Sequence, residues 1–249
     1  MTRIGVFDSG LGGLTVLKEL VKTNKASYFY FGDTMRVPYG GRPKEEIISF
    51  AENIVDYLET YDIDYYIIAC NTISVLATDI LREKYKKDFI PITEMGLRAS
   101  LAYEGDFLVL GTETTVNSHF YKNNIEKVKD SKVYELAARK LVDLIESSKL
   151  EEDKLYYYLD DYLKIANEKK ISNIILACTH YPIIRKYIEN TLTYEANIID
   201  PAVYSAKYLS SEGEKSDVNI FMSKKTLATE NLLGTIMDSP YKLEYIDLK

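Results

Sequence analysis

The sequence contains two cysteines, and both occupy the same kind of position. Cys70 ends the apolar run 65–70 and Cys178 ends the apolar run 174–178, and polar residues that favour the start of a helix follow each of them. A thiol at a helix N-terminus experiences the positive end of the helix dipole, which lowers its pKa and favours the reactive thiolate. We therefore expect the two cysteines to act as a pair of bases. The alternatives are a small apolar side chain in each core and a structural disulfide.

Two further residues have chemistry that suits this pair. His180 lies two residues after Cys178, where an imidazole can polarise the thiol or pass it a proton. The alternative is an ordinary histidine at a helix start. Asp8 ends the first apolar run, where a carboxylate can act as a base partner or bind a substrate amine. Its alternative role is that of a helix N-cap.

Other motifs give weaker signals. Two Cys and two His without C-x-x-C or H-E-x-x-H spacing do not predict a metal site, and His119 is interpreted as a surface residue without a partner. The glycine-rich run 10–15 matches neither the dinucleotide fingerprint nor the P-loop. The runs 38–40 and 111–115 combine hydroxyls with accessible backbone amides, which suits the binding of a small carboxylate.

The elements that must position these residues alternate between strand-like and helical patterns, which predicts an α/β fold with mainly parallel sheets. The expected helices include 44–60, with an apolar face and Pro43 just ahead, and 155–168, whose apolar stripe is read as core packing. The expected strands are residues 4–7, 28–31, 65–70, 107–110, 174–178 and 219–222.

An internal repeat suggests how the two cysteines come together. Residues 64–72 resemble residues 172–180, and the strand at 4–7 followed by Asp8 has a counterpart in the strand at 107–110 followed by Gly111. The carboxyl ends of parallel strands form the ligand-binding edge of such sheets. We therefore expect two α/β lobes that present these edges, and both sulfurs, to one shared cleft.

Length and composition exclude several classes of protein. The chain has 249 residues with 46% hydrophobic and 28% charged residues, which fits an ordinary globular protein of two domains. Its formal net charge of −7 argues against nucleic acid as a partner. The apolar runs are too short for a signal peptide or a membrane span, so we expect a cytoplasmic protein that does not act at a membrane.

Four motifs together resemble the glutamate racemases of the aspartate/glutamate racemase family, over nearly the whole chain from Ile4 to about Leu233. They are residues 8–13, 31–40, 70–72 and 178–182. The resemblance implies a two-lobed, pseudo-symmetric enzyme with its active site in the cleft between the lobes. Residues 1–94 plus 204–249 would form the first lobe, and residues 95–203 the second. Such an enzyme interconverts L- and D-glutamate without pyridoxal phosphate or any other cofactor, and supplies D-glutamate for peptidoglycan.

The resemblance also implies roles for individual residues. Cys70 would take the α-proton from D-glutamate with help from Asp8, and Cys178 would take it from L-glutamate with help from His180. Helix-start groups suit the stabilisation of the carbanion. The implied substrate site comprises Asp8, Ser9, Tyr39, Gly40, Asn71, Thr72, Thr179 and His180, with Asp33, Glu94, Thr112 and Thr115 as supporting residues.

The chain departs from the family pattern at three places. Residues 135–143 lack the cysteine and prolines that relatives carry, Met95 stands where a proline is usual, and Thr114 replaces a common glycine. One alternative is therefore a racemase of aspartate or another acidic amino acid, because the catalytic pair does not recognise side-chain length. Another is an interaction protein that binds DNA gyrase and turns over weakly. A homodimer is one expected assembly.

Overall fold

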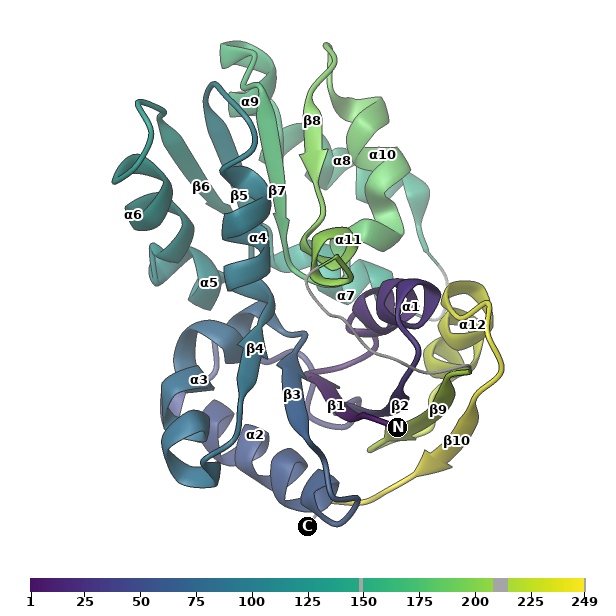
Figure 1. Cartoon of the computed structure of the whole chain (residues 1–249). Helices are drawn as coiled ribbons and strands as arrows, with labels where there is room; N and C mark the ends of the chain where they lie inside the picture. Colours follow the sequence, from purple (N-terminus) through teal and green to yellow (C-terminus); the bar gives the residue numbers. More distant parts are fainter. Residues whose placement is uncertain (148–149, 208–214, 249) are drawn as a thin grey trace.

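Two parallel sheets with helices on both faces form the two lobes of the protein (Figure 1). The computed structural model describes residues 1–147, 150–207 and 215–248. The first lobe is defined by the sheet β10-β9-β2-β1-β3-β4, and the second lobe by the sheet β6-β5-β7-β8. This architecture confirms the predicted fold class of two α/β lobes.

The strands of both sheets run parallel throughout the described residues. In the first sheet they are β1 (Arg3–Asp8), β2 (Ser27–Gly32), β3 (Tyr65–Ile68), β4 (Phe89–Pro91), β9 (Asp217–Met222) and β10 (Lys242–Tyr245). In the second sheet they are β5 (Phe107–Gly111), β6 (Val133–Ala137), β7 (Asn173–Ala177) and β8 (Asn197–Ile199).

The two sheets share one strand order. The order β2-β1-β3-β4 of the first lobe is repeated as β6-β5-β7-β8 in the second. Val6 of β1 pairs with Ile67 of β3, and Val109 of β5 pairs with Ile175 of β7. The strands β3 and β7, which lead to the two cysteines, are therefore equivalent elements, as the sequence repeat predicts.

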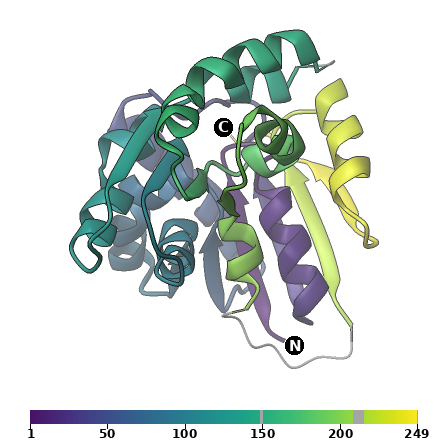
Figure 2. The ribbon, with the colours of Figure 1, turned by 90° about the horizontal axis from the view of Figure 1, so that it is seen from above.

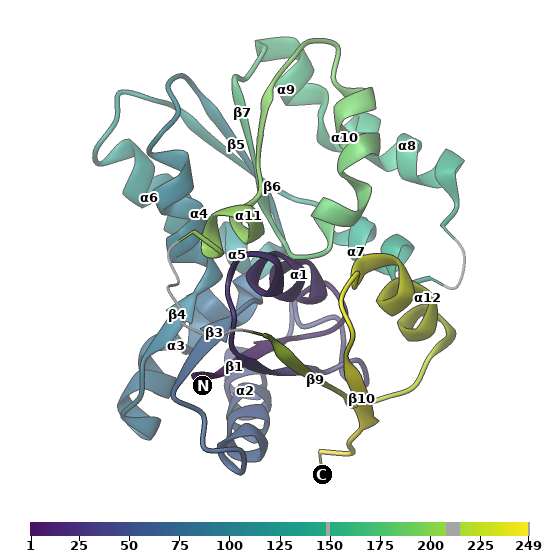
Figure 3. The same cartoon turned by 45° about the vertical axis from the view of Figure 1, so that its right-hand side comes forward.

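The helices cover the sheets and join the lobes. In the first lobe they are α1 (Leu14–Thr23), α2 (Lys44–Glu59), α3 (Asn71–Tyr85) and α12 (Leu227–Ile236). The remaining helices pack on the second sheet or at the boundary between the lobes, and they are α4 (Ile92–Ser100), α5 (Glu113–Asn117), α6 (Phe120–Glu126), α7 (Arg139–Ile145), α8 (Glu152–Tyr162), α9 (Lys164–Lys169), the 3-10 helix η1 (Tyr181–Ile184), α10 (Arg185–Thr191) and α11 (Pro201–Ser205). Helix α1 packs between α11 and α12 (Figures 2 and 3). Helix α11 in turn packs against α4.

Alternation along the buried strands explains the two apolar layers in each lobe. In β1, Ile4 and Val6 face the layer beneath α1, whereas Phe7 faces the layer beneath α2. Successive side chains of a strand point to opposite faces, so a strand covered on both sides is apolar throughout. The second sheet is likewise packed on both faces, with Leu108 in one cluster and Val109 in the other.

The six strands expected from the sequence are the interior strands of the two sheets, and all six are confirmed. The four that the sequence does not reveal, β4, β6, β8 and β10, are the edge strands. An edge strand is flanked on one side only, and it is short or carries polar residues instead of a continuous apolar run. The expected helix 44–60 corresponds to α2, but the expected helix 155–168 is interrupted at Leu163, between α8 and α9.

The division of the chain into residues 1–94 plus 204–249 and residues 95–203 stays a prediction. Strands β9 and β10 return the end of the chain to the first sheet. Residues 208–214, which the division assigns to the first lobe, lie outside the described residues. Within the described part of the chain, no helix has the length and apolar character needed to cross a membrane.

Candidate active site

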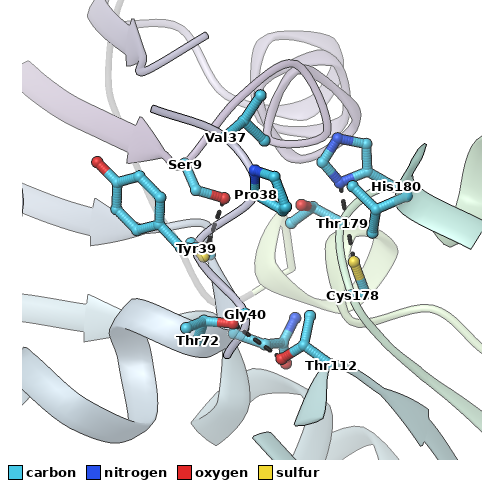
Figure 4. A pocket seen from close by; sticks show the side chains of 13 residues that line it. Ser9, Val37, Pro38, Tyr39, Gly40, Thr72, Thr112, Cys178, Thr179 and His180 are labelled. Carbon is cyan, nitrogen blue, oxygen red and sulfur yellow. Dashed lines mark hydrogen bonds between the residues drawn. The ribbon is translucent and has the colours of Figure 1, made fainter. Parts of the chain in front are cut away.

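The carboxyl ends of the two sheets face a cavity between the lobes (Figure 4). Both cysteines line it, and each is only 5% exposed. Ser9 and Tyr39 lie on one side of the cavity, and Cys178 and His180 on the other. The lining residues are Ser9, Val37, Pro38, Tyr39, Gly40, Cys70, Asn71, Thr72, Thr112, Val142, Cys178, Thr179 and His180.

The cavity is tight. Its free volume is about 20 Å³, which is room for about one water molecule. It shares Pro38, Gly40, Thr112 and Val142 with a wider outer groove of about 370 Å³. The Thr72 and Thr112 hydroxyls, 2.8 Å apart, join the lobes across the cavity. An occupant larger than a water molecule therefore requires these walls to move apart, and the outer groove lies directly beside the cavity.

Cys70 is held at the first-lobe side of the cavity. It follows β3 and directly precedes α3, and its thiol donates to Ser9 Oγ over 3.5 Å. Burial, together with the nearby negative charge of Asp8, raises the pKa of Cys70 to about 12. The expectation that the helix start lowers this pKa is therefore wrong, because desolvation of the thiolate outweighs the helix dipole.

Asp8, expected in the substrate site, is fully buried and is not among the residues that line the cavity. Its Oδ2 accepts from the backbone N–H of Gly13 at 2.8 Å and of Gly10 at 3.3 Å, so it closes the turn that leads into α1. The Thr179 hydroxyl of the other lobe lies 3.4 Å from both carboxylate oxygens. Burial raises the pKa of Asp8. The residue thus satisfies helix-start amides and also faces the second lobe.

The glycine-rich run after Asp8 allows the lobes to approach each other closely. A Cβ on Gly12 would lie 2.5 Å from Thr179 Oγ1 and 2.6 Å from His180 Nδ1. Only a residue without a side chain fits at this position. The run that does not match a nucleotide-binding motif is therefore a packing surface for the residues that follow Cys178.

Cys178 lies beside an imidazole that is itself held by a carboxylate. His180 Nδ1 is 3.7 Å from Cys178 Sγ, and His180 Nε2 is 2.6 Å from Glu146 Oε1. Burial by itself lowers the pKa of His180, but the contacts with Cys178 and Glu146 outweigh it and raise the pKa well above its usual range. The structure therefore favours an imidazolium next to the second thiol.

Glu146 is a site residue that the sequence reasoning missed. It follows α7 and lies three residues beyond the segment 135–143 that departs from the family pattern. Its Oε1 also lies 3.5 Å from the backbone nitrogen of Leu11, across the lobe boundary. The signal available was a single carboxylate after an amphipathic helix, which is a common surface pattern.

Of the four supporting residues, Thr112 lines the cavity, whereas Asp33, Thr115 and Glu94 do not. Asp33 is fully buried and accepts from Tyr39 Oη, from Ser223 Oγ at 2.7 Å and from Arg36 Nε at 2.5 Å. Tyr39 in turn lines the cavity. Asp33 therefore reaches the cavity through Tyr39.

The remaining two supporting residues differ in their distance from the site. Thr115 is buried, and its hydroxyl lies 3.0 Å from Thr112 Oγ1, which lines the cavity. Glu94 lines a separate surface groove and lies 3.3 Å from Arg82 Nη2. Glu94 is thus placed outside this cavity.

The other sequence interpretations are corrected in detail. His119, expected to have no partner, lies with Nδ1 2.5 Å from Glu135 Oε2, so the surface position is correct and the isolation is not. The departing segment forms β6 and α7, of which only Val142 lines the cavity among the described residues. In the described part of the chain, no group of three His, Cys, Asp or Glu side chains gathers as metal ligands, and the absence of a metal stays a prediction.

Comparison with known proteins identifies close relatives of this architecture. Residues 4–209 match the sequence profile of the Asp/Glu/Hydantoin racemase family. "Glutamate racemase 3" of Caldanaerobacter subterraneus subsp. tengcongensis is 34% identical over 262 residues, covering 98% of this chain and 95% of the relative. A crystal structure of a glutamate racemase from Bacillus anthracis superposes with a TM-score of 0.90 at 28% identity, covering 99% and 98% of the two chains. The Francisella tularensis glutamate racemase in complex with D-glutamate gives 0.89 at 30% identity, covering 100% and 98%.

Proposed function

The chain belongs to the Asp/Glu/Hydantoin racemase family and is an amino-acid racemase, and we propose that it interconverts L- and D-glutamate with Cys70 and Cys178 as the two bases. The observation that carries the proposal is the placement of the thiols. They follow equivalent strands of two similarly ordered sheets and line one cavity. Removal of a proton from one face of a carbon and return to the other requires a base on each side.

In the proposed reaction, the Cys70 thiolate removes the α-proton of D-glutamate, and the Cys178 thiol delivers its proton to the opposite face. The reverse reaction starts from L-glutamate, with the thiolate at Cys178 and the thiol at Cys70. In each direction, one proton moves from carbon to one sulfur and one proton moves from the other sulfur to carbon. The protonation states of the two thiols are therefore exchanged.

Different residues surround the two thiols, and each thiol is proposed to be assisted by its own neighbour. The imidazolium of His180 beside Cys178 stabilises a thiolate there, and Glu146 holds the imidazolium in place. On the other side, the raised pKa of Asp8 suits a carboxylate that accepts and returns a proton near Cys70. Asp8 and His180 are therefore proposed to prepare Cys70 and Cys178, respectively.

Charge on the carbanion has to be spread into the α-carboxylate. Ser9, Asn71, Thr72 and Thr179 line the cavity and provide hydroxyl, carboxamide and helix-start donors. Donors that are fixed in place before the reaction stabilise developing charge without reorganisation. These residues, together with Tyr39 and Gly40, form the proposed substrate site.

The proposed activity needs neither pyridoxal phosphate nor a metal, since the thiols and the surrounding donors provide each step. The partner is then a small amino acid, and the product D-glutamate would enter peptidoglycan synthesis in the cytoplasm. The relative crystallised with D-glutamate supports this choice of substrate.

The proposal is tested by incubating the protein with each enantiomer of glutamate and of aspartate while circular dichroism records the loss of optical activity. We expect racemisation of both glutamate enantiomers and α-deuterium incorporation in D2O, unchanged after dialysis against a chelator and a carbonyl reagent. Faster turnover of aspartate than of glutamate would identify aspartate as the substrate instead. Loss of activity restored by pyridoxal phosphate or metal would overturn the cofactor-free reaction. Inhibition of gyrase supercoiling without racemisation would identify an interaction protein.

A further inference from the structure

A hydrogen bond between the lobes involves Asn71, one of the residues that line the cavity. Tyr121 of α6, in the second lobe, donates its hydroxyl proton to Asn71 Oδ1, the side chain that opens α3 in the first lobe, over 3.1 Å. Tyr121 is fully buried and Asn71 is 3% exposed. A buried hydrogen bond between two side chains so far apart in sequence constrains both of them.

The contact determines how the carboxamide of Asn71 is oriented. An asparagine side chain has one acceptor oxygen and an NH2 group with two donors. Burial raises the pKa of Tyr121 far above its usual range, so its hydroxyl keeps the proton that it donates. With Oδ1 engaged by Tyr121, Nδ2 is the atom left for the cavity that Asn71 lines. No other described group forms a hydrogen bond with the Asn71 carboxamide.

The packing around Tyr121 fixes the hydroxyl in turn. A Cβ on Gly96 of α4 would lie 2.5 Å from Tyr121 Oη and 3.1 Å from its Cε1. The absence of a side chain at this position lets the ring reach Asn71. Phe120 packs edge-on against Tyr121 with the ring centroids 5.4 Å apart. The packing against Gly96 and Phe120 thus holds the Tyr121 ring in place, with its hydroxyl directed at Asn71 Oδ1.

We infer that Tyr121 is a positioning residue for racemisation, which acts by turning the Asn71 NH2 group toward the α-carboxylate of the substrate. The inference rests on the proposed function, because it places the substrate in the cavity beside Cys70. In the opposite orientation, Oδ1 would face the carboxylate and repel it. Since charge grows on this carboxylate when the α-proton leaves, a fixed donor stabilises the transition state more than the ground state.

The test is a double-mutant cycle with Tyr121→Phe and Asn71→Ala, because the first change removes only the hydroxyl. A neutral hydrogen bond typically contributes about 1 kcal/mol, and we expect Tyr121→Phe to lower kcat/KM for both glutamate enantiomers about fivefold to tenfold. If Tyr121 acts through Asn71, adding Tyr121→Phe to Asn71→Ala lowers kcat/KM no further. Tyr103→Phe, which removes one hydroxyl of the Tyr103–Tyr204 pair, neither of which lines the cavity, serves as the control and should leave kcat/KM within twofold.

The same cycle is measured by calorimetric binding of D-glutamate and by thermal unfolding. If Asn71→Ala is too slow to assay, the binding constants carry the cycle. Wild-type kcat/KM and binding in Tyr121→Phe would overturn the inference, and so would losses that multiply in the double variant. If instead Asn71→Ala leaves racemisation unchanged, the proposed donor role of Asn71 fails as well. A wild-type protein that does not racemise glutamate would overturn the proposed function itself.

Discussion

His180 Nε2 lies 2.6 Å from Glu146 Oε1, in a partly buried contact that connects the imidazole beside Cys178 to the end of α7. The contact with Cys178 and this contact with Glu146 together outweigh burial and raise the pKa of His180 well above its usual range. The charge on the imidazole therefore depends on a carboxylate that does not line the cavity.

We expect Glu146→Gln to lower the pKa of His180 and to reduce racemisation about 100-fold, the scale of general acid–base assistance. Because the folded-state pKa is raised, the stability from the ion pair is present below about pH 6.5 and is lost as pH rises through the raised pKa. The variant should lose activity at lower pH than the wild type does on the alkaline side. Profiles of kcat/KM and of Tm against pH measure both effects. Glu151→Gln, at an exposed pair with Lys154, is the control, and identical profiles in Glu146→Gln would contradict the argument.

The thiol of Cys70 should titrate at unusually high pH. Its pKa is raised to about 12 by burial and by the charge of Asp8. In the Cys178→Ser variant, Cys70 is the only remaining thiol, and we expect no thiolate absorbance at 240 nm between about pH 7 and 10. Asp8→Asn in the same background removes the negative charge and should lower the pKa of Cys70 from this value, while burial, the larger cause, still holds it above that of an exposed thiol. The variant lacking both cysteines provides the tyrosine baseline. An ordinary thiol titration in the presence of Asp8 would contradict this prediction.

Asp33 should contribute mainly to stability and to the shape of the cavity wall. Asp33→Ala leaves Arg36, whose side chain is 18% exposed, and the Tyr39 hydroxyl without their carboxylate. Removal of one partner of a buried charge pair costs about 3–5 kcal/mol. Ser223→Ala removes one hydrogen bond to the same carboxylate and the acceptor of the Met35 backbone N–H, and should cost about 1.5–3 kcal/mol. Urea unfolding measures both values, and equal losses would show that the charge pair is not the main contribution.

The interior of each sheet was predictable because its residues obey one strong rule. A strand covered on both faces must be apolar, so a polar or reactive residue at its end stands out. Asp8, Cys70 and Cys178 were all found in this way, and His180 was found through its spacing from Cys178. The edge strands, such as β4 with three residues and β6 with its half-buried positions, obey no such rule.

Residues that reach the site through packing could not be read from the sequence. Glu146 ends an amphipathic helix, and Tyr121 lies within a short one, so their local patterns indicate only surface and core. Their partners His180 and Asn71 lie far away in the sequence, and the second of these contacts joins different lobes. The predicted direction of the shift in the pKa of Cys70 was wrong. The depth of burial depends on the arrangement of both lobes, whereas the helix start depends on local sequence.

The last prediction assigns one thiol to each face of the α-carbon. Cys70→Ser and Cys178→Ser should each nearly abolish racemisation, because a hydroxyl is a far poorer base than a thiolate here. A substrate with a leaving group at Cβ, such as a β-chloro analogue of glutamate, needs only one proton abstraction before the leaving group departs. It therefore depends only on the base at its own face.

Cys70→Ser should then keep elimination from the L isomer, and Cys178→Ser should keep elimination from the D isomer, as measured by release of chloride. The two variants act as controls for each other, since the retained reaction shows that the variant is folded. Equal loss of elimination on both isomers in both variants would contradict one base per face. The opposite pattern would retain two bases and exchange their faces. Because His180 contacts Cys178 directly and Glu146 holds His180, Glu146→Gln should reduce elimination from the L isomer more than from the D isomer.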